Sequence, residues 1–261
     1  MIILLSPAKS LNETPLQRDV PITTPHFTTD TAQLARVAKD MSAQDLKELM
    51  HISDDLAKLN VKRFKSFRLN GQSNSAKPAV LTFNGDVYRG LDAESLSAKD
   101  LDFAQNHLRI LSGLYGMLNP MDALQPYRLE MGVKFENPRG KNLYEFWGDK
   151  ISRQINADAA ASGSDAVLNL ASNEYFKVVK KKVLDLPAIS PKFVEEKNGK
   201  SRVISFYAKY ARGLMARWAV ENRVTTSEDI SKFNVEGYRF DVSASTDKVP
   251  VFTRPQPAPK S

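Results

Sequence analysis

The sequence predicts an α/β protein of mixed α+β character, with a central mixed β-sheet flanked by helices and a helix-hairpin-helix-like appendage. Three observations favour this fold. Short apolar runs such as Ile2–Leu5 end at turn-forming residues, which is typical of buried strands. Segments with apolar residues at helical spacing lie between these runs. Capping sequences such as Ser42-Ala43-Gln44-Asp45 indicate where helices begin.

Five mostly apolar runs are the expected strands of the sheet. They are Ile2–Leu5, Ala79–Phe83, Leu108–Leu111, Ala166–Leu170 and Val203–Tyr207.

Several further elements have local signals of their own. Asn84-Gly85-Asp86 predicts a tight turn, after which Val87-Tyr88 is expected to be extended. Asn142 is expected to cap one helix from about Leu143 to Ala161. Asn198-Gly199 is the strongest hairpin signal in the chain.

Length and composition limit the class of protein. The chain has 261 residues, 42% of them hydrophobic, and we expect a single domain over residues 1–261. No apolar run is long enough for a membrane span, and MIILLSPAKS lacks the features of a signal peptide. The absence of cysteine excludes disulfides and thiolate chemistry and fits a reducing compartment. We therefore expect a cytoplasmic protein with no membrane partner.

Net charge points to an acidic partner. The formal charge is +7 and the sequence pI is about 9.4. Between Glu174 and Arg217, eleven Lys or Arg residues stand against four Asp or Glu, a surplus equal to that of the whole chain. Charged runs are more often solvated faces than binding sites, so clustering alone does not decide the function.

The segment at about 42–67 is the candidate DNA-binding element. Ser53 can cap a helix whose later turns are basic, and the predicted DNA contacts are Ser53, Lys58, Lys62, Arg63 and Lys65. The turn lacks the glycines that this motif normally has, and Asp54 and Asp55 would repel a phosphate at the helix start. We expect contacts to the phosphate backbone of duplex or branched DNA, without sequence specificity.

Charged residues near strand ends suggest a second kind of site. Lys9 follows the first strand, and in α/β sheets ligands collect at the carboxyl ends of strands. The predicted anion-binding cleft consists of Lys9, Tyr127, Arg128, Glu130, Glu174, Lys177, Lys209 and Arg212. Arg128 and Glu130 could instead pair only with each other, and Lys9 could be an ordinary surface lysine.

Catalytic and metal-binding motifs are scarce. The sequence has no Walker loop, no Gly-x-Gly-x-x-Gly and no Gly-x-Ser-x-Gly. Its three histidines, His26, His51 and His107, are far apart and form no ligand pair. We expect no cofactor and no metal site, and no catalytic residue is assigned.

Several ordered blocks resemble one known family. The blocks are SPAK, FNGDVYRGL, LSGLYGMLNPMDALQPYRLEMG, LYEFWGD, NLASNEYFK and ISFYAKYARGLM. Together they are similar to the bacterial YaaA family of peroxide-stress proteins from about Met1 to Asp241. The resemblance implies a cytosolic protein that limits oxidative damage from free iron, with a mixed α/β fold and a DNA-binding helix-hairpin-helix.

Three function classes remain open. The first is a DNA-binding protein that protects the cell and its DNA under peroxide stress. The second is an enzyme whose basic cleft binds an anionic or phosphorylated small molecule such as a nucleotide. The third is a non-catalytic regulator of iron. The sequence favours the first class and leaves enzymatic activity undecided.

Overall fold

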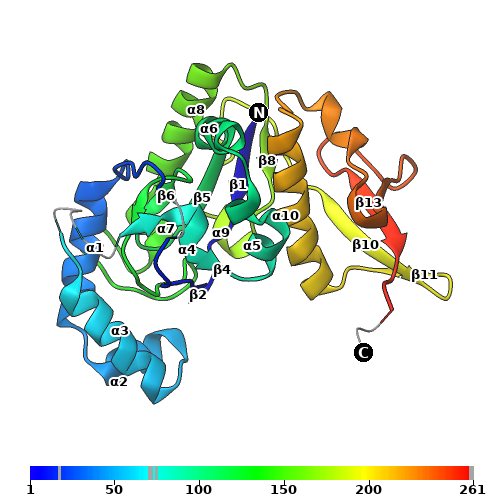
Figure 1. The fold of residues 1–261 in the computed structure, drawn as a ribbon. Coiled ribbons are helices and arrows are strands. Elements are labelled where there is room, and N and C mark those ends of the chain that lie inside the picture. Colours follow the sequence, from blue (N-terminus) through cyan, green and yellow to red (C-terminus); the bar gives the residue numbers. More distant parts are fainter. Residues whose placement is uncertain (17–18, 70–72, 74–75, 259–261) are drawn as a thin grey trace.

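A five-stranded sheet lies at the centre of the protein (Figure 1). The computed structural model describes residues 1–16, 19–69, 73 and 76–258. The strand order is β6-β5-β1-β8-β9. β1 pairs in parallel with β5 and β8, β8 pairs in parallel with β9, and β6 runs antiparallel to β5. These strands are β1 (Ile2–Leu5), β5 (Leu108–Ser112), β6 (Gly116–Leu118), β8 (Val167–Asn169) and β9 (Ala188–Ile189).

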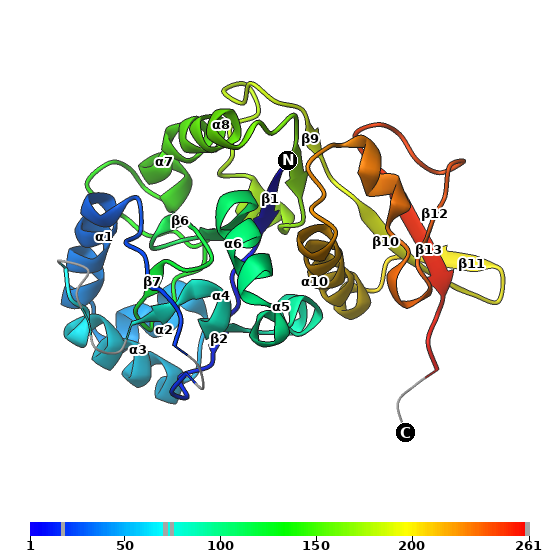
Figure 2. The same ribbon diagram turned by 45° about the horizontal axis from the view of Figure 1, so that its top comes forward.

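A second sheet of four strands lies beyond the long helix α10 (Ser205–Glu221) in both ribbon views (Figures 1 and 2). Its order is β11-β10-β13-β12. Aromatic side chains of this region pack against one another, among them Phe193, Phe233 and Phe252. The strands are β10 (Lys192–Lys197), β11 (Lys200–Arg202), β12 (Arg239–Phe240) and β13 (Val251–Pro255). Two-stranded pairs join β2 (Ser10–Leu11) to β4 (Phe83–Asn84) and β3 (Lys77–Pro78) to β7 (Ala123–Leu124).

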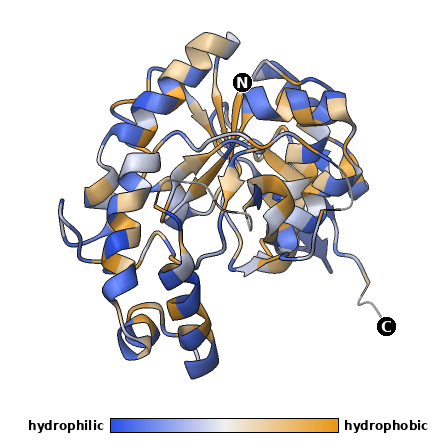
Figure 3. Ribbon diagram, turned by 60° about the vertical axis from the view of Figure 1, so that its left-hand side comes forward, coloured by the Kyte–Doolittle hydropathy of each residue, from blue (hydrophilic) through white to orange (hydrophobic). Residues whose placement is uncertain are grey.

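Helices surround the central sheet, and Figure 3 shows mostly hydrophobic strands between helices of mixed hydropathy. Nearly all buried hydrophobic side chains of the described residues form one contiguous cluster. The remaining helices are α1 (Thr28–Asp40), α2 (Ala43–Met50), α3 (Asp54–Ser66), α4 (Ala79–Thr82), α5 (Asp86–Leu91), α6 (Ala98–His107), α7 (Leu143–Trp147), α8 (Lys150–Ser162) and α9 (Asn173–Phe176), with 3₁₀ turns at Ala93–Ser95, Glu228–Lys232 and Val235–Gly237.

Helices α2 and α3 extend away from the sheet at one end of the molecule (Figure 1). The predicted caps are present: Ser42 and Asp45 form a reciprocal capping box, and the Ser53 hydroxyl accepts the Leu56 N–H. His51 closes α2 in a left-handed conformation (φ 51°) and supplies the turn without glycine. Two helices lie where they were predicted, and the helix-hairpin-helix motif and its use in DNA binding stay predictions.

Two of the five predicted strands are wrong. Ala79–Phe83 is mostly the helical turn α4, whose first N–H groups donate to the carbonyls of Asp122 and Pro120. Val203–Tyr207 overlaps the start of α10, which begins at Ser205. All four residues of α4 are buried, and a short run buried on every side has no periodicity that separates strand from helix.

Two other local predictions are also wrong, and one is confirmed. Val87-Tyr88 lies inside helix α5 rather than in extended structure. The helix expected from Leu143 to Ala161 is interrupted at Gly148 (φ 50°), which separates α7 from α8. The hairpin at Asn198-Gly199 is confirmed, with both residues at positive φ between β10 and β11.

Candidate functional site

Three serines lie at the carboxyl ends of parallel strands of the central sheet, and two of them are in contact. Ser6 follows β1, Ser112 is the last residue of β5, and Ser172 comes shortly after β8. The Ser6 Oγ accepts the backbone N–H of Ser172 at 2.8 Å and lies 3.3 Å from the Ser172 Oγ. Because β1 is parallel to both neighbours, the three carboxyl ends face the same edge, which is where α/β sheets bind ligands.

Buried tyrosines contact these serines. The Tyr88 hydroxyl donates to the carbonyl of Ser6 at 2.9 Å, and the Tyr127 hydroxyl lies 2.6 Å from the Ser112 Oγ. Burial raises the pKa of the hydroxyls of Tyr88, Tyr127 and Tyr175. Each hydroxyl is therefore neutral near pH 7 and can act as both donor and acceptor.

Lys9, Arg128 and Glu130 form an ion cluster beside these tyrosines. One oxygen of Glu130, Oε1, lies 3.4 Å from Lys9 Nζ and 3.0 Å from Arg128 Nη2. The Arg128 and Glu130 side chains are almost fully buried, whereas Lys9 is 68% exposed. The other oxygen, Oε2, is buried and has no hydrogen-bond partner among the described residues. The cluster brings together three residues of the predicted cleft, and it contains the Arg128–Glu130 pair that the sequence left open as an alternative.

Glu174 and Lys177 lie at the edge of this group. Glu174 Oε1 accepts the Gly132 N–H at 3.0 Å, and the Tyr144 hydroxyl donates to the Glu174 carbonyl. Lys177 places its ammonium 4.9 Å from the centre of the Tyr144 ring. The short helix α9 thus connects the strand-end serines to the loop that carries Glu130.

Lys209 and Arg212 are on α10, and no hydrogen bond or ion pair joins either of them to another predicted cleft residue within the described ranges. Lys209 is exposed, and burial lowers the pKa of Arg212. Their helix packs against α5 through glycines: a Cβ on Gly213 would overlap the Val87 carbonyl, and one on Gly90 would overlap that of Tyr210. The structure therefore brings Lys9, Arg128 and Glu130 of the predicted cleft together. Lys209 and Arg212 lie on a separate element, α10.

Sequence reasoning missed the site's neutral residues. Ser6, Ser112, Ser172, Tyr88 and Tyr175 were not among the predicted site residues, because isolated serines and tyrosines lack a spacing signature. The one available signal was position, since each of the three serines follows or closes an apolar run predicted as a strand.

The predicted DNA contacts on α3 differ in exposure. Lys58, Lys62 and Lys65 are exposed, and their i, i+4, i+7 spacing places them along one side of the helix. Lys39 of α1 donates to the Lys65 carbonyl at 3.4 Å and so lies beside this row. Arg63 points elsewhere, as its side chain is 13% exposed and ion-paired with Glu13.

The start of α3 is less suited to a phosphate. The Ser53 hydroxyl is used as the helix cap, and Asp54 pairs with Lys47 at 2.7 Å. Asp54 and Asp55 are both exposed in the first turn, where their charges oppose an anion. The positive surface of this appendage is therefore the side of α3 that carries the three lysines, which we call the lysine row.

Within the described parts of the chain, no group of three or more His, Asp or Glu side chains is arranged to hold a metal ion. Nor does any helix in those parts combine the length and apolar character needed to cross a membrane.

The fold and strand-end site define an α/β protein with polar groups gathered at the carboxyl edge of its parallel strands and a basic helical appendage. A family model described as peroxide stress protein YaaA matches residues 1–244. A UPF0246 protein of Maricaulis maris is 50% identical over 258 residues, covering 99% of this chain and 97% of that protein. A UPF0246 protein of Paraburkholderia xenovorans is 53% identical over 257 residues, covering 97% of this chain and 98% of that protein. The chain belongs to the YaaA family of peroxide stress proteins.

Proposed function

We propose that this peroxide-stress protein binds DNA in the cytoplasm and protects the cell and its DNA from oxidative, iron-driven damage. The DNA is duplex or branched, and the contacts go to its phosphate backbone. The observation that carries the proposal is the lysine row of α3, formed by Lys58, Lys62 and Lys65. Family membership links the chain to peroxide stress, and the exposed lysine row supports the proposal that DNA is its partner.

The dimensions of the row suit a phosphate backbone. Lys58 and Lys65 are about 10 Å apart along the helix axis, at about 1.5 Å per residue. Duplex DNA carries about three phosphates per strand over that length. Lys39 adds a fourth cation next to Lys65. Flexible ammonium groups contact phosphates without reading bases, so the binding is tolerant of sequence.

The test is the salt dependence of DNA affinity, measured by fluorescence anisotropy on duplex, junction and single-stranded DNA. About four phosphate contacts give a log–log slope of roughly −3 to −4 on duplex DNA. The variant K58A/K62A/K65A should flatten that slope by about 2.7 and weaken binding to all sequences alike.

A matched control removes the same charge elsewhere. Lys99, Lys141 and Lys248 are exposed and lie outside α3, so K99A/K141A/K248A lowers the net charge equally. Its slope should stay within about half a unit of the wild-type slope. An equal flattening of the slope in both variants would mean that DNA affinity depends only on overall charge. Undetectable binding of wild-type protein at low salt would overturn the proposal.

One observation favours a second candidate, an enzyme acting on an anionic small molecule. Glu130 Oε2 is a buried acceptor with no partner in the described structure, next to the cations of Lys9 and Arg128. A buried acceptor of this kind costs free energy until a donor reaches it. A ligand with an N–H or O–H group and an anionic group would satisfy both features. Thermal unfolding with nucleotides and phosphorylated metabolites tests this, since E130Q should abolish any rise in Tm.

A further inference from the structure

The hairpin that joins β10 to β11 carries three cations on one face. In the antiparallel ladder Lys197 is directly opposite Lys200. Arg202 is directly opposite Glu195. Cross-strand partners share a face of a sheet, and so do alternate residues of one strand. Lys197, Lys200 and Arg202 therefore lie on the same side of the hairpin.

These three cations lack counter-charges. All of them are exposed, and within the described parts of the chain no ion pair or side-chain hydrogen bond joins them to another residue. Like charges directly opposite each other destabilise an antiparallel pair, so Lys197 and Lys200 repel each other unless an anion lies between them. The arrangement is therefore one that a polyanion would stabilise.

The two acidic residues of the hairpin are engaged elsewhere. Glu195 is fully buried, and its Oε1 accepts the Tyr238 hydroxyl and lies 3.4 Å from Arg254 Nε. Glu196 alternates to the other face of the hairpin, where it accepts the hydroxyl of Ser201. Neither carboxylate neutralises the exposed cations.

An exposed aromatic ring follows the hairpin directly. Phe206 lies in the first turn of α10 and is 51% exposed, and Val203, just before it, is 57% exposed. The Arg89 guanidinium lies 5.5 Å from the centre of the Phe206 ring. Lys209, one helical turn later, is a neighbour of Phe206 on the helix surface and is exposed. Cations thus flank a ring that is half in solvent.

The start of α10 adds to the positive potential. The helix begins without a side-chain cap and has no acidic residue in its first turn, so its N-terminal dipole is not offset. Acidic side chains beside it are already paired: Asp86 with Arg89, and Glu236 with Arg254. We call the surface made by Lys197, Lys200, Arg202, Phe206 and Lys209 the hairpin face.

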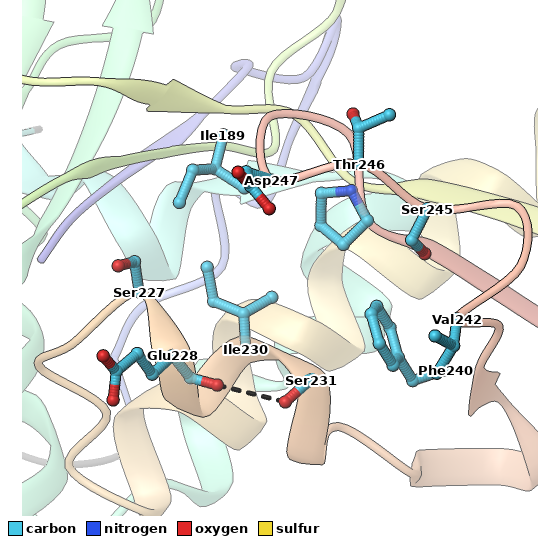
Figure 4. Close-up of a pocket in the computed structure, with 11 residues that line it drawn as sticks. Ile189, Ser227, Glu228, Ile230, Ser231, Phe240, Val242, Ser245, Thr246 and Asp247 are labelled. Carbon is cyan, nitrogen blue, oxygen red and sulfur yellow. Dashed lines mark hydrogen bonds between the residues drawn. The ribbon is translucent and has the colours of Figure 1, made fainter.

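Other acidic residues of this region lie at the far end of the same sheet. β10 and β13 run in parallel from the Lys192–Val251 pair to the Glu196–Pro255 pair, about 13 Å further on. The pocket in Figure 4, which includes Glu228 and Asp247, is lined by Ile189 and Pro250 and so lies where these strands begin. The hairpin face lies where β10 ends, and the charges of the sheet region are therefore segregated.

We propose that the hairpin face binds an unpaired DNA strand, with a base stacked on the Phe206 ring and phosphates against the four cations. Bases in a duplex stack on one another, whereas an unpaired base offers its π-face to an aromatic ring. The inference rests on the proposed DNA binding and extends it, because the lysine row then holds the duplex part of a branched DNA. In Figure 1 the hairpin and α3 are on opposite sides of the central sheet, so they contact different parts of one DNA molecule.

Substitutions of Phe206 test the stacking by fluorescence anisotropy on a labelled oligothymidine of about 20 nucleotides and on a duplex of equal length. F206A and F206L should each weaken oligothymidine binding at least about fivefold, because both remove the π-face. F206Y keeps the ring and should stay within about twofold of wild type. Duplex affinity should be unchanged in all three variants, which also shows that they are folded.

A second set of variants tests the cations. K197A/K200A/R202A should flatten the log–log salt slope on oligothymidine by about 2, at roughly 0.7 per phosphate of a single strand. The charge-matched K99A/K141A/K248A should change that slope by less than about half a unit. K58A/K62A/K65A should weaken duplex binding and leave oligothymidine affinity within about twofold of wild type.

Full oligothymidine affinity in F206L would show an apolar contact without stacking and would overturn the inference. So would an unchanged slope in K197A/K200A/R202A, or equal displacement of the oligothymidine by polyglutamate of the same charge, which would indicate a face for acidic protein segments. Duplex binding without oligothymidine binding at low salt would overturn this inference and leave the proposed function standing. Oligothymidine binding that depends on Phe206, without duplex binding, would overturn the role of the lysine row and support the hairpin face.

Discussion

Arg63 of α3 forms an ion pair with Glu13, which lies 50 residues earlier in the chain. The arginine side chain is mostly buried, so this basic residue links the appendage to the N-terminal segment instead of facing solvent. In the sequence Arg63 looks like one more DNA contact, because it lies between Lys62 and Lys65. In the structure its ion pair gives it a stabilising role instead.

R63A should therefore act on stability and leave DNA binding largely intact. We expect a loss of about 1–2 kcal/mol in the free energy of unfolding, because Glu13 loses its partner and the buried arginine stem is removed. The slope of DNA affinity against salt should change by less than about half a unit. Urea unfolding and anisotropy on one protein preparation measure both effects. A fall in slope near 0.9 with unchanged stability would place Arg63 on DNA.

E130Q should destabilise the fold. The substitution removes the charge that faces Lys9 and Arg128 at the strand-end site. Arg128 is nearly buried, so its charge would remain without compensation, and we expect a cost of about 1–3 kcal/mol. Lys9 is mostly exposed and should contribute little of this. Urea unfolding of E130Q, with exposed Glu136→Gln as control, tests the assignment; equal stability of the two variants would contradict it.

G213A should destabilise the protein although alanine is the better helix former. Alanine gains up to about 1 kcal/mol of helix propensity in α10. Its Cβ, however, would overlap the Val87 carbonyl of α5, and forcing the helices apart should cost more than this gain. We expect a net loss of about 1–3 kcal/mol by thermal or urea unfolding. K209A, on an exposed position of the same helix, should be nearly neutral, and a stabilised G213A would show that α5 and α10 separate easily.

Stability should depend on pH through His107. Its ring stacks on Phe103, its Nδ1 lies 3.1 Å from the Met1 carbonyl, and burial lowers its pKa below 6.5. Since the unfolded chain binds the proton more tightly, the stabilising contribution is complete above pH 6.5. It falls as the pH drops through the lower folded-state pKa.

Urea unfolding at pH 7.5 and pH 5 measures this contribution. H107Q should lose less stability between the two pH values than the wild type, because glutamine does not titrate. H51Q, which changes an exposed histidine, should lose as much stability between the two pH values as the wild type does. An identical pH dependence of H107Q and the wild type would remove His107 as the cause.

The sequence by itself determined the strands and caps whose signals are local. Ile2–Leu5 and Leu108–Leu111 are strands, Ser53 caps its helix, and Asn198-Gly199 closes a hairpin. Each of these depends on a few neighbouring residues, and so the pattern suffices. The family blocks, too, could be recognised from the sequence.

Tertiary structure alone decided which distant groups meet. Whether Ala79–Thr82 would be helical depended on the carbonyls of Pro120 and Asp122, which satisfy its N–H groups. The parallel pairing of β1 with β5 and β8 brings the three serines to one edge of the sheet. The same three-dimensional packing turns Arg63 inward to Glu13 and leaves Lys58, Lys62 and Lys65 in water. Burial and pairing depend on segments far apart in the chain, and no local pattern of residues records them.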